Sequence, residues 1–395
     1  MIQHATATGL DRLLRDGIPG PASQRIAVLA NQASVDRTGT HLLQHLARIG
    51  RPPSLVLSPE HGLWGTHQDM EDVGRDNDPV FGLPVHSLYG STLGSLDPSV
   101  ALLQDIDLLV ADLQDVGARY YTFAATLVRC MAAAAHTGTR VLVLDRPNPL
   151  GGAVVEGNLV EPGLASFVGE IPVPQRHGLT LGELALLARR TGPIHVDLAV
   201  LPVSGWDRST LFPGTGLPWV PPSPNMPTPA TALVYPGTCL VEGTNVSEGR
   251  GTTTPFEVVG APFVDPHRLI QAVAQERVSA GAALLPIVFR PQFGKYAGLA
   301  CRGVRIAVTD PQALRPLALG LALVKWLHLL FAPDFQWRTE TYEFVSDRLA
   351  IDLLLGESWV RPALEQNAAV ADVVARMEQS ARSFHDQRGQ VLLYP

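Results

Sequence analysis

Four short apolar segments stand out in the first half of the chain. They read RIAVLA, SLVLS, DLLVAD and RVLVLD, and they occupy residues 25–30, 54–58, 107–112 and 140–145. Their apolar residues are nearly continuous instead of alternating with polar ones, which is typical of parallel strands covered on both faces. The pattern therefore predicts four buried parallel strands.

Helical patterns separate these segments, and helices are expected over residues 39–50, 120–138 and 180–192. The second is expected to stop at Gly138, because glycine readily adopts the left-handed conformation that ends many helices. The third opens with Thr180 and Glu183 in the spacing of a capping box. Another strand is expected within 195–206. This alternation predicts an open parallel α/β sheet in a first domain, residues 1–205.

The composition changes after this domain. Residues 211–229 read LFPGTGLPWVPPSPNMPTP, which is too rich in proline for a helix or a central strand. A long ordered loop or a domain junction is expected there. Further on, the pattern predicts a strand at 301–310 and helices over 266–280, 316–331 and 368–380. We therefore expect residues 206–395 to form a smaller α+β domain.

Length and charge limit the possible functions. The 395 residues exceed the size at which one core usually stops growing, so two domains are the natural expectation. A formal net charge of -7 and the lack of any run of Lys or Arg argue against nucleic acid as a partner. The apolar segment 316–331 is short for a membrane span and contains Lys325 and His328, so we expect a packed helix. No signal peptide is visible, which predicts a cytoplasmic protein.

Polar residues follow each of the four predicted strands. They are Asn31 after the first, Glu60 and His61 after the second, Asp115 after the third, and Arg146 and Asn148 after the fourth. In an open parallel sheet the carboxyl ends of the strands share one edge, and ligands bind outside that edge. We therefore expect a pocket there. The alternative, equally weighted for any single residue, is structural: Glu60 and Asp115 would cap turns, and Asp145 would pair with Arg146.

Motifs for cofactors and metals are missing from the sequence. No GxGxxG follows the first predicted strand, and the chain contains no GxxxxGK[ST], GxSxG or HExxH. Its three cysteines lack metal-ligand spacing and are expected to be buried thiols. His61, His67 and Asp69 are conceivable metal ligands, but a solvated loop histidine is the favoured interpretation. We expect no cofactor and no metal.

Carboxylates remain as candidate catalytic groups. Besides Glu60 and Asp115, the polar segments contain Glu156, Glu242 and Glu248. Two carboxylates that face each other across a cleft can hydrolyse a glycosidic bond, one as the acid and the other as the base or nucleophile. With an acetamido sugar, the carbonyl of the substrate can attack, and the second carboxylate then only orients and polarises it. These residues favour a glycosidase.

Seven segments carry a resemblance to a known family. They read SPEHGLWG, GLPVHSLYG, DLQDVGARYYTF, LDRPNPLGG, GLPWVPPSPNMPT, YPGTCLVEGTNVSEGRGTTTPFE and GAPF. In this order, and over about residues 31–310, they resemble the family first catalogued as a domain of unknown function, DUF1343. Its characterised bacterial members are exo-β-N-acetylmuramidases of glycoside hydrolase family 171. The loop after SPEHG differs from the usual family pattern, so the subsite that it shapes is expected to differ.

The resemblance implies a Rossmann-like domain joined to a smaller carboxy-terminal domain, with a cleft between them. The implied activity is release of N-acetylmuramic acid from the non-reducing end of peptidoglycan fragments. Glu60 is the implied leading catalytic residue, and its partner is Glu242 or Glu248, with a slight preference for Glu242. The substrate-binding candidates are Asn31, His61, Asp115, Arg119, Tyr121, Arg146, Asn148, His177, Asn225, Asn245 and Arg250.

One chemical feature of this substrate can be matched to the sequence. Muramic acid carries a lactyl carboxylate, and a planar guanidinium binds carboxylates through paired hydrogen bonds. Arg119, Arg146 and Arg250 lie in the matched segments, and at least one is expected to contact that group; a structural role is equally weighted for each. Trp64, Tyr121 or Trp219 could stack on a sugar. The alternative functions are a β-N-acetylglucosaminidase and a non-catalytic muropeptide- or sugar-binding protein.

Overall fold

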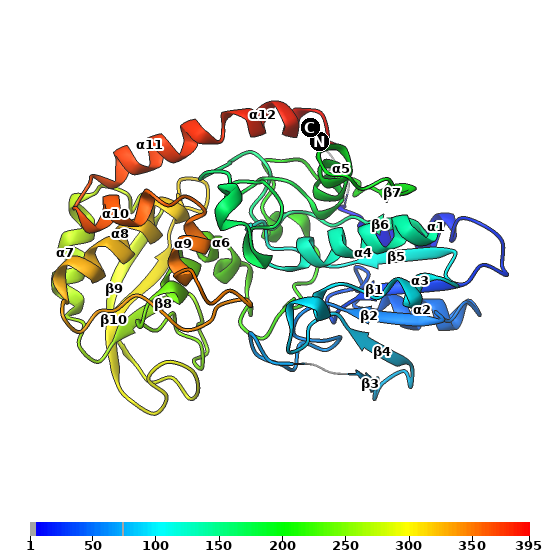
Figure 1. Ribbon diagram of the computed structural model, residues 1–395, viewed down its shortest axis with the longest axis horizontal. Coiled ribbons are helices and arrows are strands. Elements are labelled where there is room, and N and C mark those ends of the chain that lie inside the picture. Colours follow the sequence, from blue (N-terminus) through cyan, green and yellow to red (C-terminus); the bar gives the residue numbers. More distant parts are fainter. Residues whose placement is uncertain (1–4, 73–74) are drawn as a thin grey trace.

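The computed structural model describes residues 5–72 and 75–395, and the first half of this chain forms an α/β unit (Figure 1). Its sheet has seven strands in the order β3-β4-β2-β1-β5-β6-β7. All neighbouring strands run parallel except β3, which is antiparallel to β4. The bounds are β1 Ile26–Ala30, β2 Leu55–Ser58, β3 Arg75–Asn77, β4 Pro84–Ser87, β5 Leu108–Asp112, β6 Arg140–Leu144 and β7 Leu198–Leu201.

Helices cover both faces of this sheet. The helices α1 (Gly9–Asp16) and α2 (Leu42–Arg48) share a hydrophobic cluster with Val28 and Val110. The opposite face packs against α3 (Val100–Leu103), α4 (Phe123–Thr137) and α5 (Leu181–Thr191), in a second cluster that contains Leu29 and Leu109. Since successive strand residues point to opposite faces, β1 and β5 are buried at every position. The prediction of a parallel α/β sheet is confirmed.

Local signals at two helix ends are also confirmed. Gly138 follows α4 in the left-handed conformation, with φ 74°. At α5 the Thr180 side chain accepts from the backbone N–H of Glu183, and the Glu183 side chain accepts from the backbone N–H of Thr180. The strands β3 and β4, at one end of the sheet, were not predicted. They contain few residues, and β4 is only partly buried, so neither has a long apolar pattern.

The second unit is built around a three-stranded antiparallel sheet in the order β8-β10-β9. Its strands are β8 Val258–Ala261, β9 Ala282–Phe289 and β10 Cys301–Val308. Its helices are α6 Pro229–Thr238, α7 Pro266–Gln275, α8 Pro316–Leu330, α9 Ala350–Leu355, α10 Val360–Glu365, α11 Val370–Ser380 and α12 Arg382–Gly389. The expected α+β composition is confirmed. No helix in residues 5–72 and 75–395 has the length and apolar character of a membrane span.

Two glycines allow α6 and α8 to cross closely. A Cβ atom on Gly237 would lie 1.8 Å from the carbonyl oxygen of Pro316, and one on Gly320 would lie 2.2 Å from the carbonyl oxygen of Gly237. Side chains at either position would force the helices apart. Almost all of α8 is therefore buried, and the polar group of Lys325 within it pairs with Glu276.

The carboxy-terminal segment returns to the first unit. The helices α11 and α12 run along one side of the molecule and lead the carboxy-terminal end back to the first unit (Figure 1). The hydroxyl of Tyr394 accepts from the backbone N–H of Val203 at 3.0 Å and donates to Asp145. The backbone N–H of Leu393 donates to Glu183 at 2.8 Å. One hydrophobic cluster includes residues of both units, so the two units pack into a single body.

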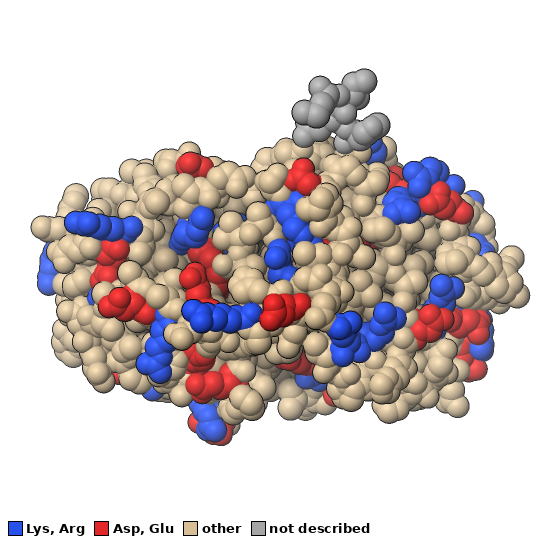
Figure 2. Space-filling view, turned by 90° about the horizontal axis from the view of Figure 1, so that it is seen from above, with Lys and Arg blue, Asp and Glu red and all other residues tan. Residues whose placement is uncertain are grey.

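Charged side chains of both signs are interspersed over the face seen in Figure 2, without a large patch of Lys and Arg. This distribution agrees with the absence of basic runs in the sequence. All three cysteines, Cys130, Cys239 and Cys301, are buried free thiols, as predicted.

Candidate active site

A polar chamber, called here the inner chamber, lies between the two units. Its walls come from the loop after β2, the start of α4, the proline-rich segment and the turn before α9. The residues that line it are Glu60, His61, Asp69, Tyr120, Tyr121, Thr122, Val168, Ser223, Asn225, Met226, Tyr235, Glu242, Arg250, Phe256, Tyr342 and Glu343. The inner chamber thus joins the SPEHG segment to the EGTNVSEGRG segment.

Glu60 is presented at the carboxyl end of β2. The chain reverses immediately after it, because His61 and Gly62 both have positive φ angles, 71° and 80°. The Oγ1 of Thr122, just before α4, donates to Glu60 Oε2 at 2.7 Å, and the backbone N–H of Met70 donates to Oε1 at 3.4 Å. Both oxygens of this buried carboxyl group are therefore held in a fixed orientation.

Glu343 enters the same chamber from a strained turn. Tyr342 and Val345 exchange backbone hydrogen bonds of 3.0 and 2.9 Å, so the two residues between them form a tight turn. Both have positive φ angles, 44° at Glu343 and 66° at Phe344. Such turns favour Asn-Gly pairs, and each non-glycine residue in this region costs about 1–3 kcal/mol. The turn places the carboxyl group of Glu343 in the chamber that Glu60 also lines.

Tyr89 fixes this turn from the first unit. Its hydroxyl donates to Glu343 Oε2 at 3.0 Å, and its ring lies 5.6 Å from the ring of Phe344. Burial, followed by the negative charge of Glu60, raises the pKa of Glu343 well above its usual value, although the hydrogen bond from Tyr89 opposes the shift. Burial and the neighbouring carboxyl group thus favour the protonated form of Glu343.

Arg250 organises the other wall of the inner chamber. Its guanidinium lies 3.1 Å from Asp69 Oδ1, 2.6 Å from Glu242 Oε1 and 3.4 Å from Glu248 Oε1. Tyr342 donates to the second oxygen of Glu242 at 2.8 Å. Burial raises the pKa of Glu242 despite Arg250, whereas Arg250 and His61 outweigh the effect of burial on Asp69 and lower its pKa.

A wider cavity, called here the outer chamber, adjoins the inner one and has a volume of about 480 Å³. The two chambers share Asp69, Glu242 and Arg250. The other residues around the outer chamber are Thr244, Asn245, Glu248, Phe293, Gly294, Lys295, Tyr296, Gln336, Trp337, Arg338, Thr339 and Glu340. The amide of Asn245 is bonded to the backbone of Asp334 and Gln336, and Lys295 lies 2.9 Å from Glu248.

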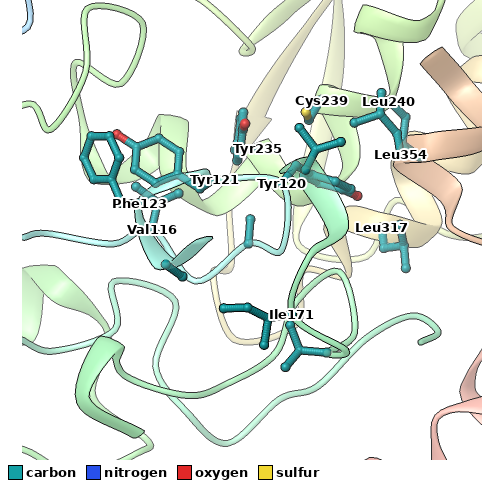
Figure 3. Packing of buried hydrophobic residues seen from close by; sticks show 14 of the residues in the cluster. Val116, Tyr120, Tyr121, Phe123, Ile171, Tyr235, Cys239, Leu240, Leu317 and Leu354 are labelled. Carbon is teal, nitrogen blue, oxygen red and sulfur yellow. The ribbon is translucent and has the colours of Figure 1, made fainter. Parts of the chain in front are cut away.

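Aromatic side chains form the floor of the inner chamber. Figure 3 shows Tyr120, Tyr121 and Tyr235 close together, with Cys239 beside them. The ring of Tyr121 lies 4.6 Å from that of Phe123 and 6.1 Å from that of Tyr235, measured between centroids. Of the aromatics expected to stack on a sugar, Tyr121 lines the chamber. Trp64 and Trp219 line neither chamber; they pack against Phe81 and Phe212, respectively.

The structure brings only part of the predicted site together. Glu60, His61, Tyr121, Asn225, Glu242 and Arg250 line the inner chamber, and Asn245 and Glu248 line the outer one. The remaining predicted residues line neither: Asn31, Asp115, Arg119, Arg146, Asn148 and His177. Glu156, another candidate carboxylate, pairs with Arg176 at 3.1 Å.

Two of the predicted carboxylate-binding arginines have structural partners. Arg146 makes a double hydrogen bond to Asp112, at 2.6 and 2.8 Å, and not to Asp145 as the structural alternative proposed. Arg119 donates to the backbone carbonyls of Asn158 and Leu354 at 2.7 and 2.8 Å. Both guanidinium groups are buried, and each holds segments of the fold together.

Polar residues at the sheet edge also bind neighbouring loops. Asn31 donates to the carbonyl of Pro222 in the proline-rich segment at 2.9 Å. Asp115 accepts from the backbone N–H of Gly117 at 2.6 Å and lies 3.6 Å from His177. Asn148 donates to the carbonyl of Leu179 at 2.8 Å. The expected crevice is thus filled over part of the edge by these loops, and the chamber lies beside Glu60.

Several residues of the chamber were not predicted, above all Glu343, Tyr342 and Thr122. Glu343 occurs in the short segment TYEF, outside every recognised motif, and nothing local marks it as part of the site. Asp69 was considered only as a metal ligand. Within residues 5–72 and 75–395, no three or more His, Cys, Asp or Glu side chains are arranged so that they could hold a metal ion. His61 is instead hydrogen-bonded to the carbonyl of His67 at 3.0 Å.

Comparisons with known proteins agree with the family resemblance. Residues 26–230 match the family model of the amino-terminal part of the exo-β-N-acetylmuramidase NamZ, and residues 233–394 match the model of its carboxy-terminal part. The two family models therefore meet near the start of α6. The domain boundary expected from composition lies earlier, at residue 205. That expected boundary stays a prediction.

Individual relatives cover the whole chain. It is 39% identical to the peptidoglycan β-N-acetylmuramidase NamZ of Bacillus subtilis over 98% of this chain and 91% of that protein. A crystal structure of a DUF1343 protein from Bacteroides fragilis matches with a TM-score of 0.87 at 28% identity, covering 99% of both chains. A second one matches with a TM-score of 0.76 at 30% identity, covering 98% of this chain and 99% of the other. The chain therefore belongs to the NamZ family of exo-β-N-acetylmuramidases, which are glycosidases.

Proposed function

We propose that this chain releases N-acetylmuramic acid from the non-reducing ends of peptidoglycan fragments, with Glu60 and Glu343 as its catalytic carboxyl groups. Membership of the NamZ family supports the reaction class. The observation that carries the assignment of residues is the meeting of two buried carboxyl groups, from different units of the fold, in one chamber.

Their environments favour different roles. Burial and the charge of Glu60 raise the pKa of Glu343 and so favour its protonated form, which suits it to give a proton to the glycosidic oxygen as the bond breaks. Glu60 accepts hydrogen bonds on both oxygens, which hold its carboxyl group in one orientation within the chamber. As the second carboxyl group it takes a proton from water, or orients the acetamido group of the substrate, at the anomeric carbon.

Glu242 and Glu248 are less suited to proton transfer with the substrate. The oxygens of Glu242 accept from Arg250 and Tyr342, and those of Glu248 lie against Arg250 and Lys295. Because both oxygens of each carboxylate are already engaged by these groups, neither carboxylate is placed to exchange a proton with the substrate. We assign to these two residues the positioning of Arg250 and of the turn that carries Glu343.

The test is turnover of aryl N-acetylmuramides and N-acetylglucosaminides by the intact protein. We expect release from the muramide, and a loss of about 10²- to 10⁴-fold in kcat for Glu60→Gln. Glu378→Gln, on the exposed face of α11, is the matched control and should keep full activity. Preferential turnover of the glucosaminide would favour the glucosaminidase alternative. Binding of muramic acid without any turnover would identify a non-catalytic sugar-binding protein.

The expected cytoplasmic location rests on the sequence alone and stays a prediction. The expected partner is a peptidoglycan-derived saccharide, and the outer chamber beside the carboxyl pair provides room for parts of the substrate that the inner chamber does not hold.

A further inference from the structure

A muramic acid differs from a glucosamine by an acidic lactyl group, so the site needs a cation for it. The three arginines expected to provide it already have partners. Arg119 binds backbone carbonyls, Arg146 binds Asp112, and Arg250 is surrounded by three carboxylates. None of them offers a free pair of N–H donors to a ligand.

Arg338 also lines the outer chamber, and it differs from these three arginines in its contacts. Its backbone N–H donates to the carbonyl of Gly243 at 2.9 Å, which fixes it next to the segment that carries Glu242. Its guanidinium carbon lies 5.0 Å from the centre of the Tyr342 ring. The side chain is half-buried, so it is positioned by the protein while part of it faces the cavity.

The donors of Arg338 are weakly used. Its Nη2 approaches the carbonyl of Thr341 at 3.4 Å and the sulfur of Met70 at 3.6 Å, which are long contacts for a charged donor. Within the part of the chain that the structure describes, no carboxylate lies at ion-pair distance from it. Arg338 lines the outer chamber, so its guanidinium is available to a ligand in that cavity.

The surrounding charges make this cation more significant. Carboxyl groups dominate both chambers, and the two other cations, Arg250 and Lys295, are paired with them. The ionised carboxylates among them would repel an acidic substrate. Arg338 is the described cation of this cavity that can compensate the charge of a ligand.

We propose that Arg338 binds a carboxylate of the substrate and thereby selects muramic acid derivatives over glucosamine derivatives. This inference rests on the proposed function, because it assigns the substrate-recognition residue of the same site. Both chambers share Glu242 and Arg250, so a sugar with its reacting bond near Glu60 can extend an acidic substituent toward Arg338. The carboxylate is that of the lactyl group, or that of a stem peptide when the lactyl group is amidated.

The experiment measures inhibition constants of three probes against the intact protein and Arg338→Met. The probes are N-acetylmuramic acid, N-acetylglucosamine and an N-acetylmuramoyl peptide whose lactyl group is amidated. Methionine keeps the packing against Tyr342 but has no charge. We expect the preference for N-acetylmuramic acid over N-acetylglucosamine to fall by roughly 10- to 100-fold, because a charged hydrogen-bonding partner is lost.

The probes also separate the two sources of the carboxylate. If Arg338→Met loses affinity for N-acetylmuramic acid, the carboxylate bound by Arg338 is that of the lactyl group. If it loses affinity for the muramoyl peptide alone, the carboxylate is that of the stem peptide. Arg338→Lys keeps the charge without the planar fork and should restore part of the preference. Arg348→Met is the control, since Arg348 is exposed and pairs with Asp347, and it should leave the preference unchanged.

Two outcomes in a folded Arg338→Met protein would overturn this assignment. One is an equal loss of affinity for all three probes, and the other is an unchanged affinity for both acidic probes. These outcomes are distinct from a failure of the proposed function. A protein that does not hydrolyse muramides but shows the Arg338-dependent preference would lack the proposed activity and still recognise the carboxylate as inferred.

Discussion

The proposed acid, Glu343, gives the sharpest test of the mechanism. Glu343→Gln removes the ionisable proton while it keeps the length of the side chain and an oxygen that can accept from Tyr89. The strained backbone at Glu343 and Phe344 is unchanged by this substitution, because glutamine has the same steric requirements there. The variant should therefore fold and bind, and its defect should lie in the chemical step.

The expected magnitude follows from the role of the proton. General acid catalysis contributes about 10²- to 10⁴-fold, so kcat on a natural disaccharide should fall by that amount while KM changes little. An aryl glycoside with a good leaving group needs less protonation. Its loss should be clearly smaller, and this difference separates an acid from a residue that only shapes the site.

The pH dependence has a definite sign. Burial and the charge of Glu60 raise the pKa of Glu343 well above its usual value, and the protonated form is the active one. Activity should therefore be retained at pH values below that pKa and fall as the pH rises through it. Stability should follow the same direction, because the unfolded chain ionises Glu343 at a lower pH than the folded chain does.

The assay is kcat and kcat/KM across the pH range for both substrates, with the wild-type chain and Glu343→Gln. The alkaline fall in kcat should be present in the wild-type chain and absent from the variant. The reasoning is refuted if the variant keeps the same alkaline fall, or if it loses equal activity on good and poor leaving groups.

Three further predictions test other parts of the structure. Thr122→Val removes the donor to Glu60 and should lower kcat/KM by roughly 10- to 100-fold. Thr122→Ser keeps a hydroxyl donor and should retain most of the wild-type kcat/KM. Equal losses of kcat/KM in both variants would contradict a hydrogen-bonding role. Burial raises the pKa of Asp145 to about 6. As the pH rises from about 4 to 6, the free energy of unfolding of the wild-type chain should therefore fall by up to about 3 kcal/mol relative to that of Asp145→Asn. Urea unfolding at several pH values measures this, and a difference that does not change with pH would contradict it. Gly320→Ala should lower the free energy of unfolding by about 1–3 kcal/mol, because the new Cβ would lie too close to α6. The control is Gly389→Ala, where a Cβ meets no atom within 4 Å. It should change the stability little in the same unfolding assay.

The strands of the first unit illustrate what a local pattern can predict. The runs that became β1, β2, β5 and β6 were recognisable because strands buried on both faces require continuous apolar residues. The capping box of α5 and the glycine after α4 were recognisable because both depend on a few adjacent residues. The short strand β4, which is only partly buried, lacks such a pattern.

The candidate site was predictable where a motif carried it. Glu60, Glu242 and Arg250 lie in family segments, and they line the same chamber. Asp115 and Arg146 lie in family segments as well, yet they line neither chamber. A motif preserves residues that support the fold along with those that face a ligand, and the sequence has no means of separating the two.

The sequence by itself determined the central strands and three of the helices of the first unit, the buried cysteines and the family, because each depends on a local pattern or on a long matched segment. Only the tertiary structure decided that Arg146 pairs with Asp112, that Glu343 lies in the chamber with Glu60, and that Arg338 has no carboxylate partner among the described residues. These are contacts between segments far apart in the chain. They depend on how the two units pack, because the charge and the pKa of a side chain are set by neighbours that only the folded protein brings together.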